Sequence, residues 1–153
     1  MGAAALLLTA CGGFLLAVLW MDLMFDVQVL GHGKRAELPE PVLVSIASYY
    51  RRATTSSRPM SYLIALVMAI LLAALGFEAI RGGDPAWLLL TSAILAGFPI
   101  LLAALRTVPN AVRLGARLDG PAGQTRLARS VLRDHLVCLG CILAFLAVRL
   151  ATA

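Results

Sequence analysis

Two aspartates stand at the end of a strongly apolar segment near the start of the chain. Asp22 and Asp26 are four residues apart in the stretch LWMDLMFDVQVLGH, a spacing that places both on one face of a helix. Carboxylates are costly where lipid hydrocarbon begins, and in membrane helices they usually face the bundle interior and find polar partners. The sequence therefore predicts that these two side chains face other helices.

Other polar side chains flank the remaining apolar segments, in the stretches SYYRRATT, LRTVPNAVR and RDH. If the apolar segments are antiparallel helices, these stretches meet the two aspartates at one face of the membrane. We call this predicted group the polar cluster. Besides the two aspartates, it contains Tyr49, Tyr50, Arg51, Arg52, Arg106, Asn110, Arg113, Arg133, Asp134 and His135.

The polar cluster has a structural interpretation. The two carboxylates would be neutralised by Arg106, Arg113 or Arg133, and the resulting ion pairs would lock the helix ends together. In this case the cluster carries no chemistry of its own.

The polar cluster also has a functional interpretation, as a pocket that opens to the cytoplasm. Such a pocket would hold an amphiphilic substrate, a lipid headgroup or a quinone-like ring. Asp22, Asp26 and His135 are the candidate catalytic residues, because a carboxylate or an imidazole can move a proton. The tyrosines, the arginines and Asn110 are the candidate binding residues.

Metal binding is a less favoured use of the same residues. Asp22, Asp26 and His135 are suitable ligand types, but the sequence has no paired Glu-x-x-His motif of the di-iron bundle kind. His135, Cys138 and Cys141 recur at three-residue steps and are possible ligands of a soft metal. Cysteines in an apolar helix are usually packing residues, however. We therefore expect no metal site, and the sequence specifies no cofactor.

The composition indicates what positions these residues. Of 153 residues, 61% are hydrophobic and only 14% are charged, with a mean hydropathy of +0.90. Soluble domains keep about a quarter of their residues charged, so the chain is predicted to be a single all-α, multi-pass membrane domain. The net charge of +5 does not indicate nucleic acid as a partner, because the basic residues lie in short loops beside apolar segments.

Four segments have the roughly 20 apolar residues that a membrane-spanning helix needs. The second span should end at the turn RGGD, and its Glu78 is expected to pair with Arg81 or to reach water. Pro99 lies inside the third span and is predicted to kink it. The loop before the second span is predicted to form a short helix at the membrane interface, over residues 41–55. The predicted spans are residues 3–25, 60–80, 87–105 and 131–150. The helix of the first span is expected to extend as far as Leu30, with Gly31 as its stop.

The basic residues predict the orientation of the bundle. Five lie between the first two spans and six between the third span and the start of the fourth, so eleven of thirteen share one side. By the positive-inside rule that side is cytoplasmic and both termini lie outside. We expect a bacterial inner-membrane protein, with the lipid bilayer as a partner and with a membrane-protein partner or a homo-oligomer as further possibilities. The eleven basic residues on the predicted cytoplasmic side include Lys34 and Arg58.

The stretches VPNAVRLG and RSVLRDHLVCLGCILAFLAV, together with four short spans, resemble the anthrone-oxygenase-like family of small membrane proteins. The resemblance covers the pattern of spans and about 40 residues of the C-terminal half. The matching positions are Pro109, Asn110, Arg113, Arg133 and His135. What it implies is a four-helix membrane protein, and cofactor-free oxidation of a polycyclic aromatic substrate.

Two classes of function follow. The first is an accessory or interaction subunit whose polar cluster is structural or docks a partner. The alternative is a small membrane enzyme or binder that acts on an amphiphilic or aromatic molecule, quinone-like or anthrone-like, in a cytoplasm-facing pocket. A water-accessible cavity with an unpaired His135 beside Asp22 would favour the second class. An arginine on every carboxylate, with no cavity left, would favour the first.

Overall fold

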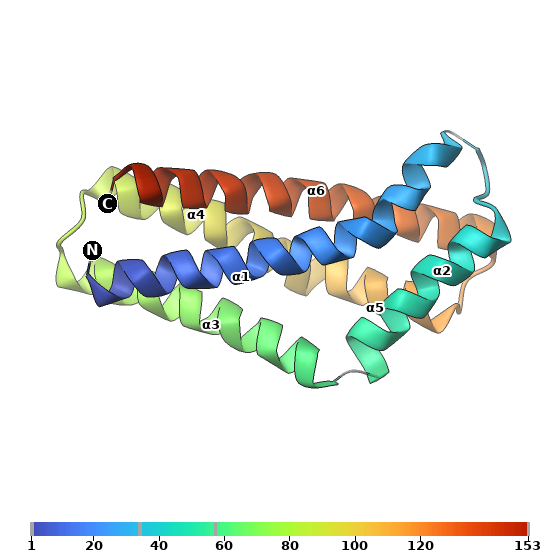
Figure 1. Ribbon diagram of the computed structural model, residues 1–153, viewed down its shortest axis with the longest axis horizontal. Helices are drawn as coiled ribbons and strands as arrows, with labels where there is room; N and C mark the ends of the chain where they lie inside the picture. The colour runs from blue at the N-terminus through green and yellow to red at the C-terminus, as the bar shows by residue number, and fades with distance from the viewer. Residues whose placement is uncertain (1, 34, 57, 153) are drawn as a thin grey trace.

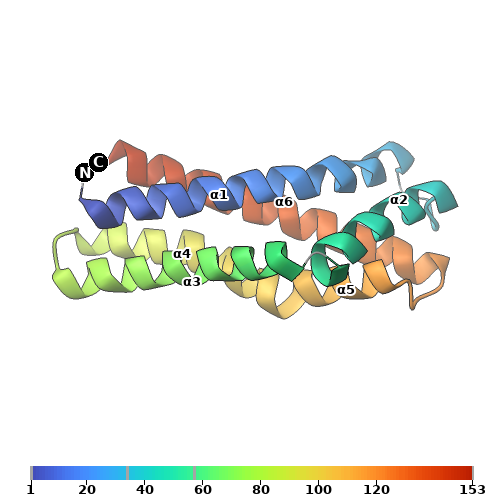
Figure 2. The same cartoon turned by 60° about the horizontal axis from the view of Figure 1, so that its bottom comes forward.

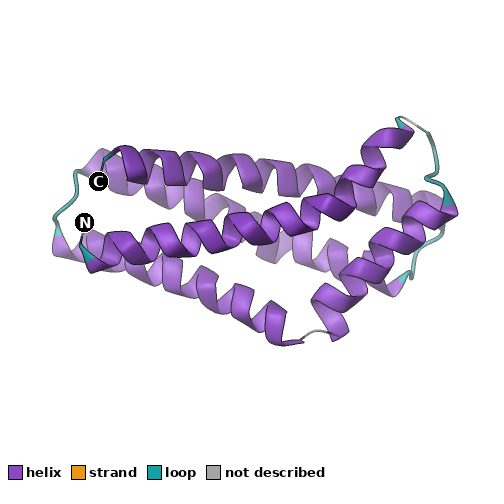
Figure 3. Cartoon of the chain, viewed as in Figure 1, coloured by secondary structure: helices purple, strands orange, loops and turns teal. Residues whose placement is uncertain are grey.

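The fold is built from helices, as Figure 1 shows for the computed structural model, and no strand occurs in residues 2–33, 35–56 and 58–152, which the structure describes. Two of the basic residues used to predict the orientation are affected. Lys34 lies outside the described residues, and so does the side chain of Arg58. Short loops join the helices (Figure 3). The all-α prediction is therefore confirmed for the described residues.

Four helical segments are long and apolar enough to cross a membrane. This confirms the number and the approximate places of the predicted spans. The first is α1 (Ala3–Asp26) with the 3₁₀ turn η1 (Val27–His32), the second is α3 (Arg58–Arg81), the third is α4 (Ala86–Leu102) with η3 (Ala103–Thr107) and α5 (Val108–Ala116), and the fourth is α6 (Pro121–Ala151).

Two of these segments extend well beyond the apolar runs. Helix α6 begins at Pro121, ten residues before the predicted start at Val131, because Gly120 and Pro121 provide a favourable N-terminus and the polar first turns still bury side chains such as Gln124. The third segment continues to Ala116 instead of ending near Leu105. Apolar length did not predict either extension, because residues of both extensions contact protein on one side only and carry charged residues on the other.

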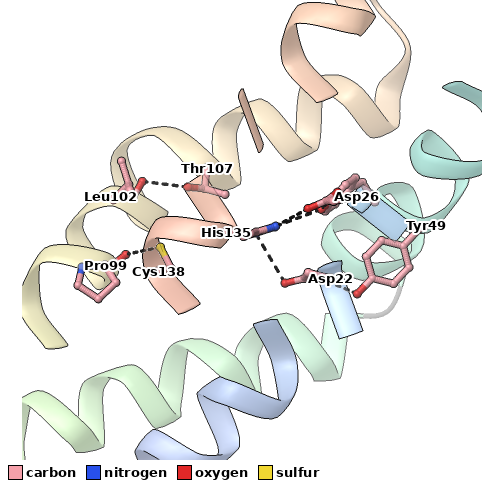
Figure 4. Close-up of polar contacts among 9 residues, drawn as sticks. Asp22, Asp26, Tyr49, Pro99, Leu102, Thr107, His135 and Cys138 are labelled. Atoms are coloured by element: carbon pink, nitrogen blue, oxygen red, sulfur yellow. Dashed lines mark hydrogen bonds and ion pairs between the residues drawn. The ribbon is translucent and has the colours of Figure 1, made fainter. Parts of the chain in front are cut away.

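The backbone of the third segment changes its pitch after Pro99. Helix α4 continues through the proline, and the next turn, η3, is π-helical. The Oγ1 of Thr107 donates to the carbonyl of Leu102, 3.4 Å away (Figure 4). A π-helical turn adds one residue to the helical repeat, so α5 presents a different face to the bundle than a continuous α-helix would.

The four long segments pack as an antiparallel bundle (Figures 1 and 2). Helix α1 contacts α6 and α3, and α4 also contacts α6 and α3. One apolar core, which includes Leu8, Leu71 and Phe145, fills the end of the bundle where the chain termini lie. A second core, which includes Leu43, Leu114 and Val131, fills the opposite end.

A shorter helix, α2 (Glu40–Arg51), completes that opposite end and is followed by the π-helical turn η2 (Arg52–Ser56). These two elements match the predicted helix over residues 41–55. The buried face of α2 packs on α5 and on α6, so its Tyr50 points into protein. Close packing with α5 requires Gly115, because a Cβ there would lie 2.7 Å from the backbone nitrogen of Arg51.

Candidate functional site

The candidate site lies where α1, α2 and α6 meet. Asp22 and Asp26 come from α1, Tyr49 and Tyr50 from α2, and His135 from α6. Figure 4 shows Asp22 and Asp26 directed toward His135, and Tyr49 directed toward Asp22. The structure thus brings together five of the residues that the sequence assigned to the polar cluster. We call these five residues the Asp–His–Tyr site.

Asp26 is the most buried member of the site. Its side chain is fully inaccessible, and its Oδ1 accepts a hydrogen bond from the hydroxyl of Tyr50 at 2.7 Å. Its Oδ2 lies 2.7 Å from Nδ1 of His135. An ionised Asp26 can only accept a hydrogen bond here, and in that state Nδ1 of His135 carries the proton and Nε2 is the nitrogen with which the imidazole can react.

Asp22 occupies a more open position one helical turn earlier. Its Oδ1 accepts a hydrogen bond from the hydroxyl of Tyr49 at 2.6 Å, and its Oδ2 lies 3.7 Å from Nε2 of His135. The ring of Tyr49 is held by Phe25, with which it stacks at a centroid distance of 4.1 Å. Asp22 and Nε2 of His135 therefore face the same space without forming a short hydrogen bond.

The two tyrosines act as neutral hydrogen-bond donors. Burial, followed by the charges of Asp22 and Asp26, raises the pKa of both Tyr49 and Tyr50 far above the ordinary tyrosine value. Both hydroxyls therefore keep their protons at any physiological pH. The negative charge of the site belongs to the aspartates.

A cavity of about 360 Å³ lies against one side of the site. Asp22, Tyr50 and His135 line the cavity, whereas Asp26 and Tyr49 do not. Asp26 therefore contacts His135 without facing the cavity. Most other lining side chains are apolar and come from α1, α3, α4, η3, α5 and α6, among them Leu15, Leu19, Ile64, Met68, Pro99, Ile100, Ala103, Ala111 and Ile142. The cavity thus combines the polar groups of Asp22, Tyr50 and His135 with largely apolar walls, to which Thr54, Ser61 and Thr107 add hydroxyls.

The cavity opens on the side of the bundle between α3 and the η3–α5 segment. Ala65 of α3 lines it and is exposed, as are Ala104 and Val108 across from it. Helix α3 packs against α1 and α4, while α5 packs against α2 and α6, and these separate contacts leave the opening between them. The residues at the opening are apolar, and the alanines Ala65 and Ala104 among them fill little of it because their side chains are small.

The predicted arginine partners of the two aspartates are wrong for the described residues. Arg106 instead lies 3.2 Å from Asp134 and donates to Ser130, and Arg113 pairs with Asp119 at 2.8 Å. The physical reason lies in the rotation of α6. Its inward face carries Asp134 and His135, so Arg133 is turned outward and is exposed. Arg51 at the end of α2 and Arg52 at the start of η2 are also exposed. Asn110 is half-buried and does not line the cavity.

The cysteines of α6 contribute no metal-type cluster. Among the described residues, no three His, Cys, Asp or Glu side chains are grouped so that they could hold a metal ion. The thiol of Cys138 lines the cavity and lies 3.8 Å from the carbonyl of Pro99 (Figure 4). Its partner is thus a backbone carbonyl of α4.

An ion-pair cluster that the sequence did not predict closes the opposite end of the bundle. Arg149 binds both carboxylate oxygens of Glu78, at 2.7 and 2.9 Å, and lies 2.8 Å from Asp84. Glu78 therefore does not pair with Arg81, whose guanidinium lies over the ring of Phe77. Arg149 follows Glu78 by 71 positions, and no local pattern in the sequence signals such a distant partner.

Comparison with known proteins finds no match among protein-family models, curated proteins or solved structures. The resemblance to the anthrone-oxygenase-like family stays a prediction.

Proposed function

We propose that this protein binds an amphiphilic or aromatic molecule in the cavity beside the Asp–His–Tyr site. The observation that carries the proposal is the cavity itself, in which apolar walls lead to Asp22, Tyr50 and His135. Ligand sites usually combine mostly apolar walls with a few convergent polar groups, in volumes of roughly 300–1,000 Å³. The apolar body of the ligand occupies the walls, and its polar head meets Asp22 and His135.

The geometry also suits a proton transfer at the head of the ligand. Asp26 holds the imidazole of His135 with the proton on Nδ1, so Nε2 is free to accept a proton from a phenolic hydroxyl. Asp26 then stabilises the imidazolium that forms, as the carboxylate of a catalytic triad does. A hydroxylated aromatic ring of the anthrone or quinol kind is a substrate that this base would activate.

The membrane placement is part of the proposal. The site lies at the end of the bundle that carries most of the described arginines, which favours a cytoplasmic position in a bacterial inner membrane with both termini outside. Helix α2 would then lie near the cytoplasmic interface. A reporter fused to the C-terminus tests this orientation: alkaline phosphatase should be active there and green fluorescent protein dark. The opposite result would place the site outside.

A structural or accessory role is the second candidate. The observation in its favour is that Asp26, Tyr50 and His135 satisfy one another without a ligand. In that role the site would hold α1, α2 and α6 together, and the protein would serve as a subunit of a larger membrane complex or as a homo-oligomer. The two candidates differ in whether anything occupies the cavity.

The binding proposal is tested with an alkyl-substituted naphthol and the purified full chain in uncharged-lipid nanodiscs. Naphthol fluorescence reports both binding and loss of the phenolic proton. The Ala104→Trp variant fills the cavity rim and should weaken binding by at least about tenfold. Ala69→Trp adds the same ring to an exposed position of α3 outside the cavity lining and should bind like the unmodified protein.

Two results would reject the binding proposal. One is the absence of saturable binding, and the other is equal binding by the Ala104→Trp and Ala69→Trp variants. Either result would leave the accessory role as the remaining candidate. Binding without a loss of the phenolic proton would retain the binding role and reject the proton transfer.

A further inference from the structure

We infer that the cavity selects amphiphiles whose head carries a positive charge. This inference rests on the binding part of the proposed function, independently of the proton transfer, and it narrows the class of ligand to cationic amphiphiles. It starts from the balance of charges at the polar end of the cavity, where Asp22 and Asp26 face a single imidazole.

With both aspartates ionised, the balance of charges is negative whichever state the imidazole takes. His135 is the one basic side chain in an ion pair with either aspartate among the described residues. With His135 protonated, the two carboxylates leave one negative charge uncompensated, and with His135 neutral they leave two. The hydroxyls of Tyr49 and Tyr50 donate hydrogen bonds to the carboxylates but bring no charge.

The arginines of the polar cluster either pair with other acids or are exposed, as Arg51, Arg52 and Arg133 are. Arg106 pairs with Asp134 at 3.2 Å, and Arg113 pairs with Asp119 at 2.8 Å. Each of these pairs satisfies one acid with one base, so neither provides a spare positive charge to the Asp–His–Tyr site. A cation at the polar end would complete the charge balance that the bundle itself leaves open.

Asp22 is the group placed to receive that cation. It lines the cavity, and its Oδ2 has no partner nearer than Nε2 of His135 at 3.7 Å among the described residues. Asp26 is fully buried behind His135, and both of its oxygens already accept hydrogen bonds. A positive head would therefore contact Asp22 and be attracted by Asp26 at longer range.

The walls of the cavity restrict which cations fit. The lining beyond Asp22, Tyr50 and His135 is mostly aliphatic, and a small, strongly hydrated ion would lose its water there without replacement. A cation that carries its own apolar body loses little hydration and covers the walls. An anion of the same shape would meet two carboxylates, and repulsion would exclude it.

Two probes of matched shape and opposite charge test the inference. The tetraphenylphosphonium cation and the tetraphenylborate anion are both lipophilic, and each is titrated into the full chain in uncharged-lipid nanodiscs. Binding is taken as the part that the Ala104→Trp variant loses, which removes partition into lipid. We expect the cation to bind at least about tenfold more tightly than the anion.

Substitutions at Asp22 separate charge from shape. Asp22→Asn should weaken binding of the cation by about tenfold or more, and Asp22→Glu should restore much of it. Asp119→Asn makes the same chemical change at a carboxylate paired with Arg113 outside the cavity, and it should leave binding unchanged. Gel filtration and thermal melting verify that each variant is folded.

The possible failures are distinguishable. Equal binding of both ions, lost in Ala104→Trp, would overturn the charge selection and leave the cavity as a binding site. The same conclusion would follow if the naphthol bound and neither ion did. If neither the ions nor the naphthol showed binding sensitive to Ala104→Trp, both the inference and the proposed function would be rejected.

Discussion

The Nδ1 atom of His135 lies 2.7 Å from Oδ2 of Asp26, although 109 positions separate the two residues. This contact joins the last helix of the bundle to the first, and the hydroxyl of Tyr50 joins α2 to the same carboxylate. Asp26 is therefore the point at which three helices are linked by polar contacts. Asp22, one turn away, is left facing the cavity.

Asp26→Asn should destabilise the bundle more than Asp22→Asn does. An amide in place of the fully buried carboxylate presents N–H groups to Tyr50 or His135, and an unsatisfied buried polar group costs about 1–3 kcal/mol. The side chain of Asp22 is 15% exposed, so water can reach an amide at this position and fewer buried polar groups lose their partners. Thermal melting in the same detergent measures both. A melting temperature of Asp26→Asn equal to that of the unmodified protein would contradict the central role of Asp26.

Tyr49 and Tyr50 should not ionise in the folded protein at about pH 11. Their raised pKa means that the folded state holds protons that the unfolded chain loses near pH 10. The stability that these tyrosines provide is thus complete below about pH 10 and declines as the pH rises further. Tyrosinate absorbance at pH 11 should be the same for the Tyr49→Phe/Tyr50→Phe variant and for the unmodified protein. A larger signal from the unmodified protein would show that the two hydroxyls are accessible.

Gly115→Ala should disturb the contact between α2 and α5. The added methyl group would lie 2.7 Å from the backbone nitrogen of Arg51 and 3.0 Å from the carbonyl carbon of Tyr50, so backbone must move. Such overpacking costs about 1–3 kcal/mol. Gly97→Ala is the matched control, because a Cβ at Gly97 meets nothing within 4 Å. Equal melting temperatures for the two variants would show that α2 is loosely held.

Arg149→Gln should destabilise the opposite end of the bundle. The side chain of Arg149 is 6% exposed, and its removal leaves Glu78, at 12% exposure, without a partner of opposite charge. Removing one member of a buried pair costs about 3 kcal/mol. The double variant Arg149→Gln/Glu78→Gln should melt at a higher temperature than Arg149→Gln alone. Arg81→Gln, at an exposed arginine, should change little, and a similar loss in all three variants would argue against a specific pair.

The sequence alone was sufficient to locate the four long apolar helices and the inward-facing carboxylates. Apolar length is a local property, so four runs of hydrophobic residues predicted the four segments that the structure contains. The cost of a carboxylate beside lipid is also local, and it predicted that Asp22 and Asp26 face other helices. A local pattern in the loop before the second span likewise predicted the helix that the structure contains as α2.

Only the tertiary structure decided which groups meet these carboxylates. Net charge near the helix ends favoured arginines, but the rotation of α6 turns His135 inward and Arg133 outward. That rotation depends on packing along the whole helix from Pro121, and the cavity depends on the π-helical turn η3 and on how far α3 lies from α5. Partners and cavities result from the packing of several helices at once, and a pattern within one segment carries no information about that packing.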